Sequence, residues 1–436
     1  MKFWQFFKSL LLAVLLMSFL SPAAQAFCGF YVGKADSKLY NQASQVVIAK
    51  DGNRTILTMA NDYQGGVKDF AIVVPVPVVI QQEQVRIGDP EIIDRLDSFT
   101  APRLVEYFDE DPCEVLRPMP ASGVSRGGAN ARTAERSQEE SLGVTVEAKF
   151  SVGEYDIAIL SAKESDGLET WLNQNGYKIP QGASPLLRPY IRQNMKFFVA
   201  KVNLAEFEKG GYSFLRPLMI AYESPKFMLP IRLGMINSKG EQDLIVYVLS
   251  PKGQAEITNY RTVNVPSDAE IPVYIKAEFA NFYKAMFDNS YKKEGKKVAF
   301  LEYAWNMAGC DPCSAEPLNQ EELKKAGVFW LTPNSNNNVF VTRLHVRYSR
   351  DTFPEDLMFQ ETSNQQFFQG RYILRHPFKG SLSCEAGKQY QKSLPARFDK
   401  EAQTLAKLTG WNVQEIRNKM KYIQTQKDPF WRNIWP

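Results

Sequence analysis

Alternating apolar and polar residues predict β-strands through much of the chain. Ser44–Lys50 and Arg54–Ala60 flank a short polar turn, which is typical of a β-hairpin. Val144–Ala162 alternates in the same way and turns near Gly153. The apolar stretch Asp69–Val79 carries two prolines, and a proline cannot donate a hydrogen bond to a neighbouring strand. We therefore expect the end of that stretch to lie at a sheet edge or to leave the sheet.

Further strands are predicted toward the C-terminus, and helices are predicted between them where apolar residues recur three or four positions apart. Ser165–Pro180 begins with a capping serine, and Tyr274–Lys293 carries an apolar stripe. Pro90–Phe99 begins with a proline, and Asp399–Gln424 is a helix pair broken at Gly410. The remaining strands are 195–204, 214–224, 227–237, 243–250, 255–265, 297–305, 338–349 and 370–378, and the shorter helices are 184–194 and 318–327.

This order of elements predicts an α+β fold, mainly of antiparallel sheet, with peripheral helices and a helical C-terminus. Two pairs of similar stretches, in the same order, also indicate an internal duplication. Arg54–Pro77 is similar to Leu229–Pro251 in its Met-x-Asn, polar turn, Asp and proline-terminated strand. Leu104–Cys113 is similar to Phe300–Cys313 in its Glu-Tyr and Asp-Pro-Cys. We therefore expect two related β-rich halves, with Asp-Pro-Cys as a turn in each.

The first 26 residues have the pattern of a signal peptide. Lys2 and Lys8 precede the apolar stretch Leu10–Leu20, and small residues lead to a cleavage site after Ala26. The apolar stretch is shorter than the roughly 20 residues that span a bilayer, although an uncleaved anchor is the alternative. We expect a periplasmic or extracellular protein with no transmembrane span after cleavage.

Changes in composition divide the mature chain into segments. Residues 27–116 are predicted to form an N-terminal β-rich domain, 143–316 a second α+β domain, and 317–436 a C-terminal extension of strands and helices. Residues 117–142 carry few large apolar side chains, so burial cannot offset their ordering entropy and we expect a flexible loop. The loop is either a tolerated surface insertion or a site of nicking or regulation.

Charge and histidine content narrow the function classes. With 52 Lys and Arg against 48 Asp and Glu, the chain offers no electrostatic case for binding nucleic acid. Its two histidines, His345 and His376, count against zinc enzymes, Ser/His/Asp hydrolases and Cys/His proteases. The acidic stretch Glu106–Pro112 matches no calcium loop, and we expect a solvated turn there. We expect neither a cofactor nor a bound metal.

Five cysteines fit an oxidising compartment, where most would be paired. They are Cys28, Cys113, Cys310, Cys313 and Cys384. The odd number leaves one thiol unpaired or bonded to another molecule. The sequence leaves the pairing open: we expect a Cys310–Cys313 bond, or a bond from one of these two to Cys384. A Cys28–Cys113 bond is the other expected pairing.

Cys310-x-x-Cys313 could instead be a redox pair, because a strand precedes it and the helix Leu318–Gly327 follows, as in thioredoxins. Two features favour a structural bond. Residues 314–317 separate the motif from its helix, and the carboxylate of Asp311 disfavours a thiolate at Cys310.

The sequence thus favours a non-enzymatic binding or structural module of the cell envelope, whose partner is an unknown envelope protein or small ligand. One alternative is a thiol–disulfide oxidoreductase that uses Cys310 and Cys313. A second is a hydrolase with carboxylate chemistry, because paired acids need no sequence signature.

Several motifs resemble those of a known family. The stretches "TMANDYQG", "VVPVP", "VEYFDEDPC", "FLEYAWNMAGCDPC", "VTRLHVRYSRDTFPEDLMFQE" and "GRYILRHPF" are similar in combination to a family of secreted bacterial proteins catalogued as domain of unknown function 2330. The resemblance covers nearly the whole mature chain. It implies bacterial export and implies no activity, cofactor or catalytic residue.

Overall fold

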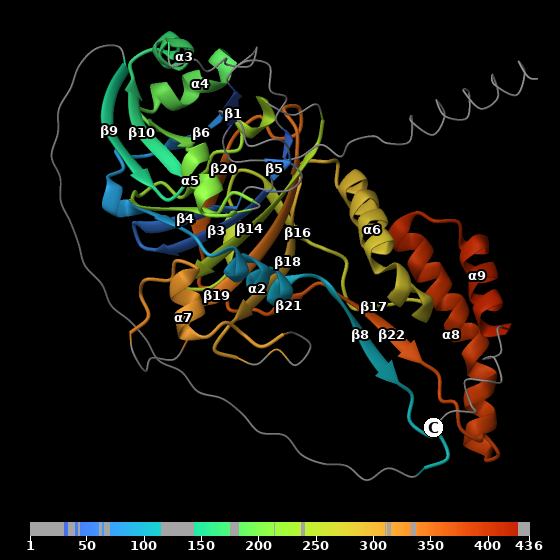
Figure 1. The fold of residues 1–436 in the computed structure, drawn as a ribbon. Helices are drawn as coiled ribbons and strands as arrows, with labels where there is room; N and C mark the ends of the chain where they lie inside the picture. The colour runs from blue at the N-terminus through green and yellow to red at the C-terminus, as the bar shows by residue number, and fades with distance from the viewer. Residues whose placement is uncertain are drawn as a thin grey trace, which may run out of the picture.

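The chain has an α+β fold, as predicted, with mostly antiparallel sheets and helices packed on them (Figure 1). The computed structural model describes residues 30–33, 40–41, 44–60, 63–64, 70–114, 144–174, 183–212, 214–236, 240–309, 311, 315–332 and 337–425. The expected signal peptide and the expected loop at 117–142 lie outside the described residues.

The largest sheet has nine strands and runs through the centre of the molecule. Its order is β16 (Arg261–Asn264), β18 (Val298–Asn306), β19 (Phe340–Tyr348), β14 (Gln242–Ser250), β3 (Ser44–Asp51), β4 (Arg54–Ala60), β12 (Leu218–Glu223) and β7 (Val85–Ile87), with β21 (Phe368–Gln369) paired to β18. The β3–β14 and β16–β18 pairs are parallel, and the other pairs are antiparallel.

A five-stranded antiparallel sheet packs against one face of the large sheet. Its order is β1 (Phe30–Gly33), β6 (Phe70–Val76), β11 (Lys196–Val202), β10 (Tyr155–Ala162) and β9 (Val144–Val152). Ile72, Ile159 and Phe198 from this sheet share one core with Val46 and Val246 from the large sheet. The helices α3 (Ser165–Gln174) and α4 (Ala183–Arg192) cover its opposite face.

Helices cover the other face of the large sheet. α2 (Pro90–Thr100) and α7 (Gln320–Lys325) pack on β3 and β14 through Val47 and Tyr247. α6 (Phe279–Lys293) follows the 3₁₀ turn η3 (Val273–Glu278) and packs on β18 through Phe300. The smaller elements are β2 (Tyr40–Asn41), β5 (Tyr63–Gln64), η1 (Gln82–Gln84), α5 (Leu204–Lys209), β13 (Met228–Leu229), η2 (Gly234–Ile236), β15 (Ala255–Ile257) and β20 (Leu357–Glu361).

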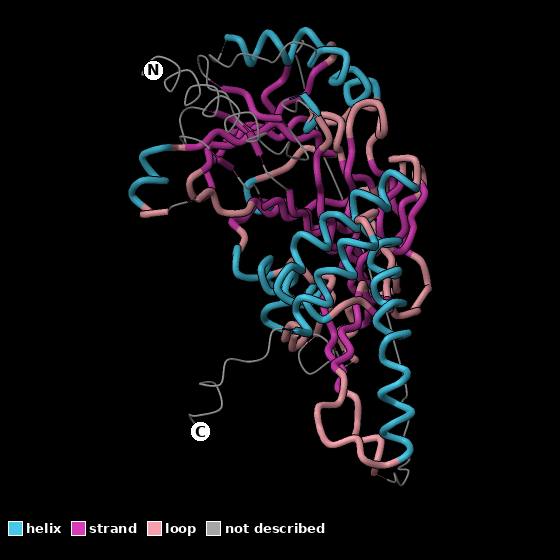
Figure 2. Tube along the Cα trace, turned by 90° about the vertical axis from the view of Figure 1, so that its right-hand side faces the viewer, coloured by secondary structure: helices cyan, strands magenta, loops and turns pink. Residues whose placement is uncertain are grey.

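A C-terminal arm projects from this body, and its helices run beside its strands (Figures 1 and 2). We define the arm as the three-stranded sheet β17 (Ala269–Glu270), β22 (Arg371–His376) and β8 (Arg103–Phe108), together with α6, α8 (Glu385–Thr409) and α9 (Val413–Thr425). All of its strand pairs are parallel. Gly410 ends α8 with φ of 77°, so the predicted break between the two terminal helices is confirmed.

Several predicted elements are confirmed, and two are wrong. β3 and β4 form the predicted hairpin, and Gly153 turns β9 into β10 with φ of 56°. On one side of β6, Pro75 pairs with β11. On the other side, the pairing with β1 extends only to Val73, so among the described strands β6 has a single neighbour at Pro75, as predicted for a sheet edge. The predicted strand at 227–237 is wrong beyond β13, because η2 and turns replace it. α8 begins at Glu385, well before the predicted helix.

The cores do not follow the predicted domain boundaries. The large sheet takes strands from all three predicted segments, because β3 pairs with β14 and β14 pairs with β19. The stretches predicted to be duplicated also occupy different places. β6 lies in the five-stranded sheet and β14 in the large one, and β8 lies in the arm whereas β18 is central. At these strands the structure therefore has no matching halves.

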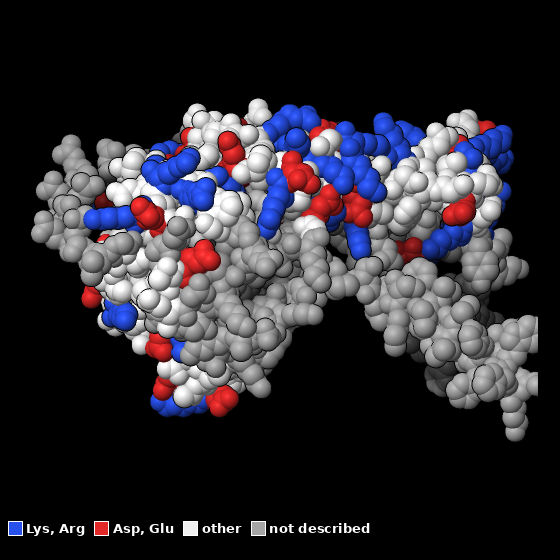
Figure 3. All heavy atoms as spheres, turned by 90° about the horizontal axis from the view of Figure 1, so that it is seen from above, with Lys and Arg blue, Asp and Glu red and all other residues white. Residues whose placement is uncertain are grey.

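Charges of both signs are interspersed on the surface seen from above (Figure 3). None of the helices in the described ranges is long and apolar enough to cross a membrane. Within the same ranges, no three His, Cys, Asp or Glu residues are grouped so that they could hold a metal ion.

Candidate functional site

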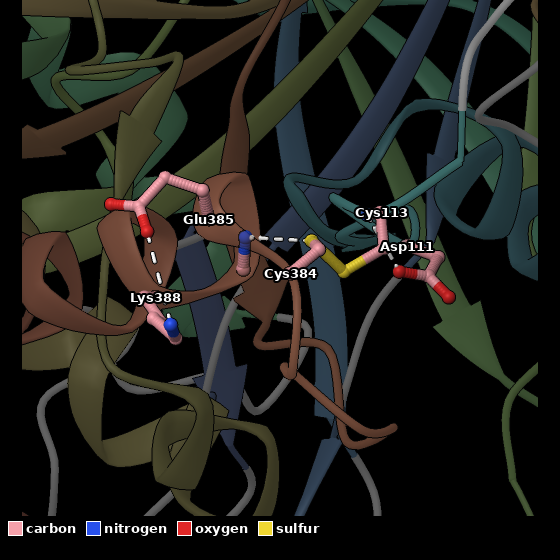
Figure 4. The surroundings of a disulfide bond; sticks show 6 residues. Asp111, Cys113, Cys384, Glu385 and Lys388 are labelled. Carbon is pink, nitrogen blue, oxygen red and sulfur yellow. Dashed lines mark hydrogen bonds and ion pairs between the residues drawn. A yellow bond between two sulfur atoms is a disulfide. The ribbon is translucent and has the colours of Figure 1, made fainter.

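The structure contradicts the predicted pairings of two cysteines, Cys113 and Cys384. Cys113 is bonded to Cys384, with their Cα atoms 6.0 Å apart (Figure 4). This excludes a Cys28–Cys113 bond and a bond from Cys310 or Cys313 to Cys384. The physical reason is the parallel pairing of β8 with β22, which brings the segments after both strands to the same end of the arm.

The disulfide is built into local structure on both sides. Cys384 caps α8, and its Sγ accepts a hydrogen bond from the Gly387 backbone N–H (3.1 Å). The Cys113 N–H donates to Asp111 Oδ1 (2.8 Å), which confirms the predicted turn in the first Asp-Pro-Cys. The bond spans 271 residues of sequence, for which the chain-entropy model gives a stabilisation on the order of 5 kcal/mol.

The proposed redox cysteines, Cys310 and Cys313, lie outside the described residues, as does Cys28. Asp311, between the first two, is described. Its Oδ2 accepts hydrogen bonds from Tyr303 Oη (2.9 Å) and Gln369 Nε2 (2.7 Å), and the residue is buried. The oxidoreductase therefore stays a prediction.

A densely charged site is buried between α6 and the large sheet. Arg343 Nε and His345 Nδ1 donate to the two oxygens of Glu302, at 2.6 and 2.8 Å. Tyr283 Oη, from α6, also donates to this carboxylate. His345 Nε2 donates to Asp243 on β14 (3.0 Å). Because both nitrogens of His345 face carboxylates, both can donate only if the imidazole is protonated.

Three further ion pairs extend this buried cluster. Arg347 binds both oxygens of Asp243, at 2.8 and 2.9 Å, and also pairs with Asp288 of α6. Arg343 Nη1 donates to Asp97 of α2 (2.6 Å). The cluster thus links two helices to three strands.

Opposite charges set the protonation of the cluster. Burial alone would raise the pKa of Glu302, but the charges of His345 and Arg343 outweigh burial and lower it to about 2. Burial would lower the pKa of His345, but Glu302 and Asp243 raise it above its ordinary value. Glu302 is therefore ionised near neutral pH, and its charge together with that of Asp243 favours the protonated form of His345. Phe287 of α6 stacks on the His345 ring, with centroids 3.9 Å apart.

A β-bulge explains the position of Glu302. The β18–β19 register shifts between Leu301 and Tyr303, so Glu302 and Tyr303 both face the helices. On β19 the sequence Arg-x-His-x-Arg puts Arg343, His345 and Arg347 on that same face. This alternation was visible in the sequence, and so was the helix α6. The position of that helix over these three side chains was not.

The arm has its own ionic cluster, which corrects the expectation of a solvated acidic turn at 106–112. Glu106 accepts hydrogen bonds from Lys276 (2.6 Å) and His376 (2.8 Å). Asp109 pairs with Arg397 of α8. Glu401, on the same helix, is 2% exposed, and burial raises its pKa to about 7 despite the nearby Arg397.

An open cavity of about 610 Å³ lies where β7, β12, α2 and α7 meet. It is lined by four cationic side chains, one carboxylate and several apolar groups. The charged members are Arg86, Arg216, Lys324, Lys325 and Asp89. Sequence reasoning singled out none of them. Arg86 lies in a three-residue strand, the two lysines lie in a six-residue helix, and Arg216 and Asp89 lie just before β12 and α2, so no recognisable motif links them.

Two of the four cations already have partners. Arg216 Nη2 donates to the buried Glu154 (2.6 Å), whose hydrogen bonding raises the pKa of Arg216. Lys325 Nζ donates to Asp89 (3.0 Å), which raises the pKa of Lys325. In the described parts of the chain, the side chains of Arg86 and Lys324 make no ion pair. No member of the buried Glu302 cluster lines this cavity.

Comparison with known proteins places the chain in a family. The family described as "Uncharacterized protein conserved in bacteria" (DUF2330) matches residues 22–360. The chain belongs to the DUF2330 family. The resemblance inferred from the motifs is therefore confirmed. No curated protein and no solved structure matches the chain.

The DUF2330 match includes the cavity and the buried Glu302 cluster, and it ends before β22, α8 and α9. Cys113 lies inside the matched region, and Cys384 lies beyond it. The disulfide therefore ties the family region to the helical end of the arm.

Proposed function

We propose that this DUF2330 protein is an exported module that binds a small ligand in the cavity between β7, β12, α2 and α7 and does not transform it. The observation that carries the proposal is the cavity itself. Its volume of about 610 Å³ falls within the range of roughly 300–1,000 Å³ that is common for small-molecule sites.

The cavity walls are held together by interactions between distant segments. Lys325 of α7 pairs with Asp89 at the start of α2. Arg95 of α2 pairs with Glu322 of α7 (3.2 Å) and donates to the backbone oxygen of Glu316 (3.2 Å). The two helices are therefore fixed relative to each other, which favours a cavity formed before a ligand enters.

The chemistry of the lining supports binding without turnover. Arg and Lys stay protonated near neutral pH and do not exchange protons with a substrate there. The carboxylate of Asp89 accepts the Glu91 N–H (3.1 Å) and pairs with Lys325. The titratable side chains of the buried clusters, Glu302, His345 and Glu401, do not line the cavity. The hydrolase alternative would need them to contact a substrate.

Export is supported by the leader-like N-terminus and by the Cys113–Cys384 bond, because disulfides persist mainly outside the cytoplasm. If the protein is exported, its ligand is a molecule found outside the cytoplasm.

A thermal-shift screen of small compounds tests the proposal, with purified mature protein and the variant Met219→Trp. Met219 lines the cavity, so the larger indole should occupy ligand space. We expect at least one compound to raise the melting temperature of the wild type and not that of the variant. Met420→Trp on α9 is the control and should respond as the wild type does. Identical responses of Met219→Trp and wild type to every stabilising compound would overturn the proposal.

A further inference from the structure

We propose that the ligand of this cavity is a small organic anion with at least two negative charges, carried by phosphate or carboxylate groups. The inference rests on the proposed function and adds the chemical class of the ligand.

The charge balance of the lining is the first argument. Four cations (Arg86, Arg216, Lys324 and Lys325) and one carboxylate (Asp89) give a net charge of +4 − 1 = +3. Like charges that share a cavity repel one another, and an anion between them removes that repulsion. Even if Glu154 behind Arg216 is counted, the site keeps a charge of +2.

The second argument is that Arg86 and Lys324, which have no ion pair among the described residues, come from different walls of the cavity. Arg86 lies on β7, where it pairs in register with Met219 of β12. Lys324 lies on α7. Both are exposed, and within the described residues neither makes an ion pair. An anionic group that binds both would bridge the strand wall and the helix wall, as Lys325 and Asp89 already bridge α7 and α2.

The start of α2 does not supply the anion site, because its amide groups are occupied. Pro90 has no N–H, and Asp89 accepts from the Glu91 N–H through its side chain and from the Ile92 N–H (3.2 Å) through its backbone. Side-chain cations must therefore provide the binding energy. Binding should accordingly depend on Arg86 and Lys324 and weaken as salt screens them.

The type of anion follows from the remaining lining groups. The planar guanidinium of Arg86 can bind phosphate or carboxylate through two hydrogen bonds, and a lysine adds a point charge. Ile87, Pro90 and Met219 offer apolar surface for the carbon part of a ligand. These groups together fit an organic phosphate or a polycarboxylate, either free in solution or at the headgroup of an anionic lipid.

Isothermal titration calorimetry at low salt tests this inference. The probes are pyrophosphate and citrate, with glucose and choline as neutral and cationic comparisons. We expect pyrophosphate or citrate to bind the wild type, and the double variant Arg86→Ala/Lys324→Ala to raise its Kd at least tenfold. The control Lys392→Ala/Lys400→Ala removes the same charge from the exposed face of α8 and should change Kd less than twofold.

Two checks keep the result interpretable. The side chains of Arg86 and Lys324 are exposed, so without ligand the variants should have the same melting temperature as the wild type. The variant Lys324→Glu, which reverses one charge, should also abolish binding. Sedimentation with cardiolipin and phosphatidylcholine vesicles identifies the source, because the cardiolipin headgroup carries two phosphates. Binding to cardiolipin that needs Arg86 and Lys324 assigns a lipid headgroup, and its absence assigns a soluble anion.

The outcomes also separate this inference from the proposed function. If no anion binds, or if anions bind Arg86→Ala/Lys324→Ala as tightly as wild type, the inference is overturned. If glucose, choline or another uncharged or cationic compound then binds in a way that Met219→Trp blocks, the proposed function stands. If no compound depends on Met219, both are overturned.

Discussion

The Nδ1 atom of His345 donates a hydrogen bond to the Glu302 carboxylate at 2.8 Å, and α6 covers both side chains. The two residues lie on neighbouring strands, and Arg343 contributes a second cation to the same carboxylate. Buried charges of this kind are stable only while they are balanced. The buried cluster therefore fixes α6 to the large sheet, and its energetics can be tested one residue at a time.

Replacing Glu302 with glutamine should strongly destabilise the protein. The amide has nearly the same shape but removes the carboxylate charge shared by Arg343 and His345, which then keep only Asp97 and Asp243 as partners. Losses of about 3–5 kcal/mol are typical when one partner of a buried ion pair is removed. Urea denaturation followed by circular dichroism measures the change. Glu223→Gln is the control, because Glu223 and Arg54 form an ion pair with side chains about half exposed (52% and 51%) and should contribute less than about 1 kcal/mol. Equal effects of the two variants would contradict a balanced buried cluster.

Glu302 should also make the free energy of unfolding depend on pH in the acidic range. The pKa of Glu302 is lowered to about 2 in the folded state, against an ordinary value of about 4.3 in the unfolded chain. Its contribution is therefore complete above pH 4.3 and is lost as the pH falls toward 2. The difference in unfolding free energy between wild type and Glu302→Gln, measured from pH 2 to 6, should shrink as the pH falls. A difference that stays constant would show that Glu302 has an ordinary pKa.

Glu401 should have the opposite pH dependence. Burial raises its pKa to about 7, so between pH 4.3 and 7 the folded state keeps a proton that the unfolded state releases. The stability of the wild type relative to Glu401→Gln should therefore decrease by roughly 3 kcal/mol from pH 4 to pH 8. Denaturation at these two pH values gives the result. Glu415→Gln, at an exposed position on α9, should show no such trend, and a trend shared by both variants would contradict the assignment to Glu401.

The arm should depend on its disulfide. Non-reducing peptide mass spectrometry of the protein from its own host should find a Cys113 peptide joined to a Cys384 peptide. Cys113→Ser/Cys384→Ser should lower the free energy of unfolding by about 2–5 kcal/mol and increase amide hydrogen exchange in α8. Cys310→Ser/Cys313→Ser is the matched control and should leave exchange in α8 unchanged. A Cys113 thiol that alkylates freely in the native protein would contradict the pairing.

The features that could be predicted from the sequence are those that depend on interactions between neighbouring residues in the chain. The hairpin of β3 and β4 and the turn at Gly153 follow from alternation and turn residues that are neighbours in the chain. The pairing of β3 with β14 does not, because nothing local specifies which distant strand completes a parallel pair. The partner of Cys113 was missed for the same reason, since it depends on β8 lying beside β22.

The cavity illustrates the same limit. Arg86 lies in a three-residue strand and Lys324 in a six-residue helix, and neither segment has a periodicity that marks a site. Their proximity depends on the large sheet and on the ion pairs between α2 and α7. The alternating strand that carries His345 was predicted from the sequence. The two carboxylate partners of His345 come from β14 and β18 and could not be identified locally.

The most direct test of the account is native mass spectrometry of the protein isolated from its own bacterial host. The wild type should carry a bound small molecule that is released on denaturation, and Met219→Trp isolated in the same way should lack it. Wild type and Met219→Trp with the same mass excess, or with none, would contradict a ligand held in the cavity.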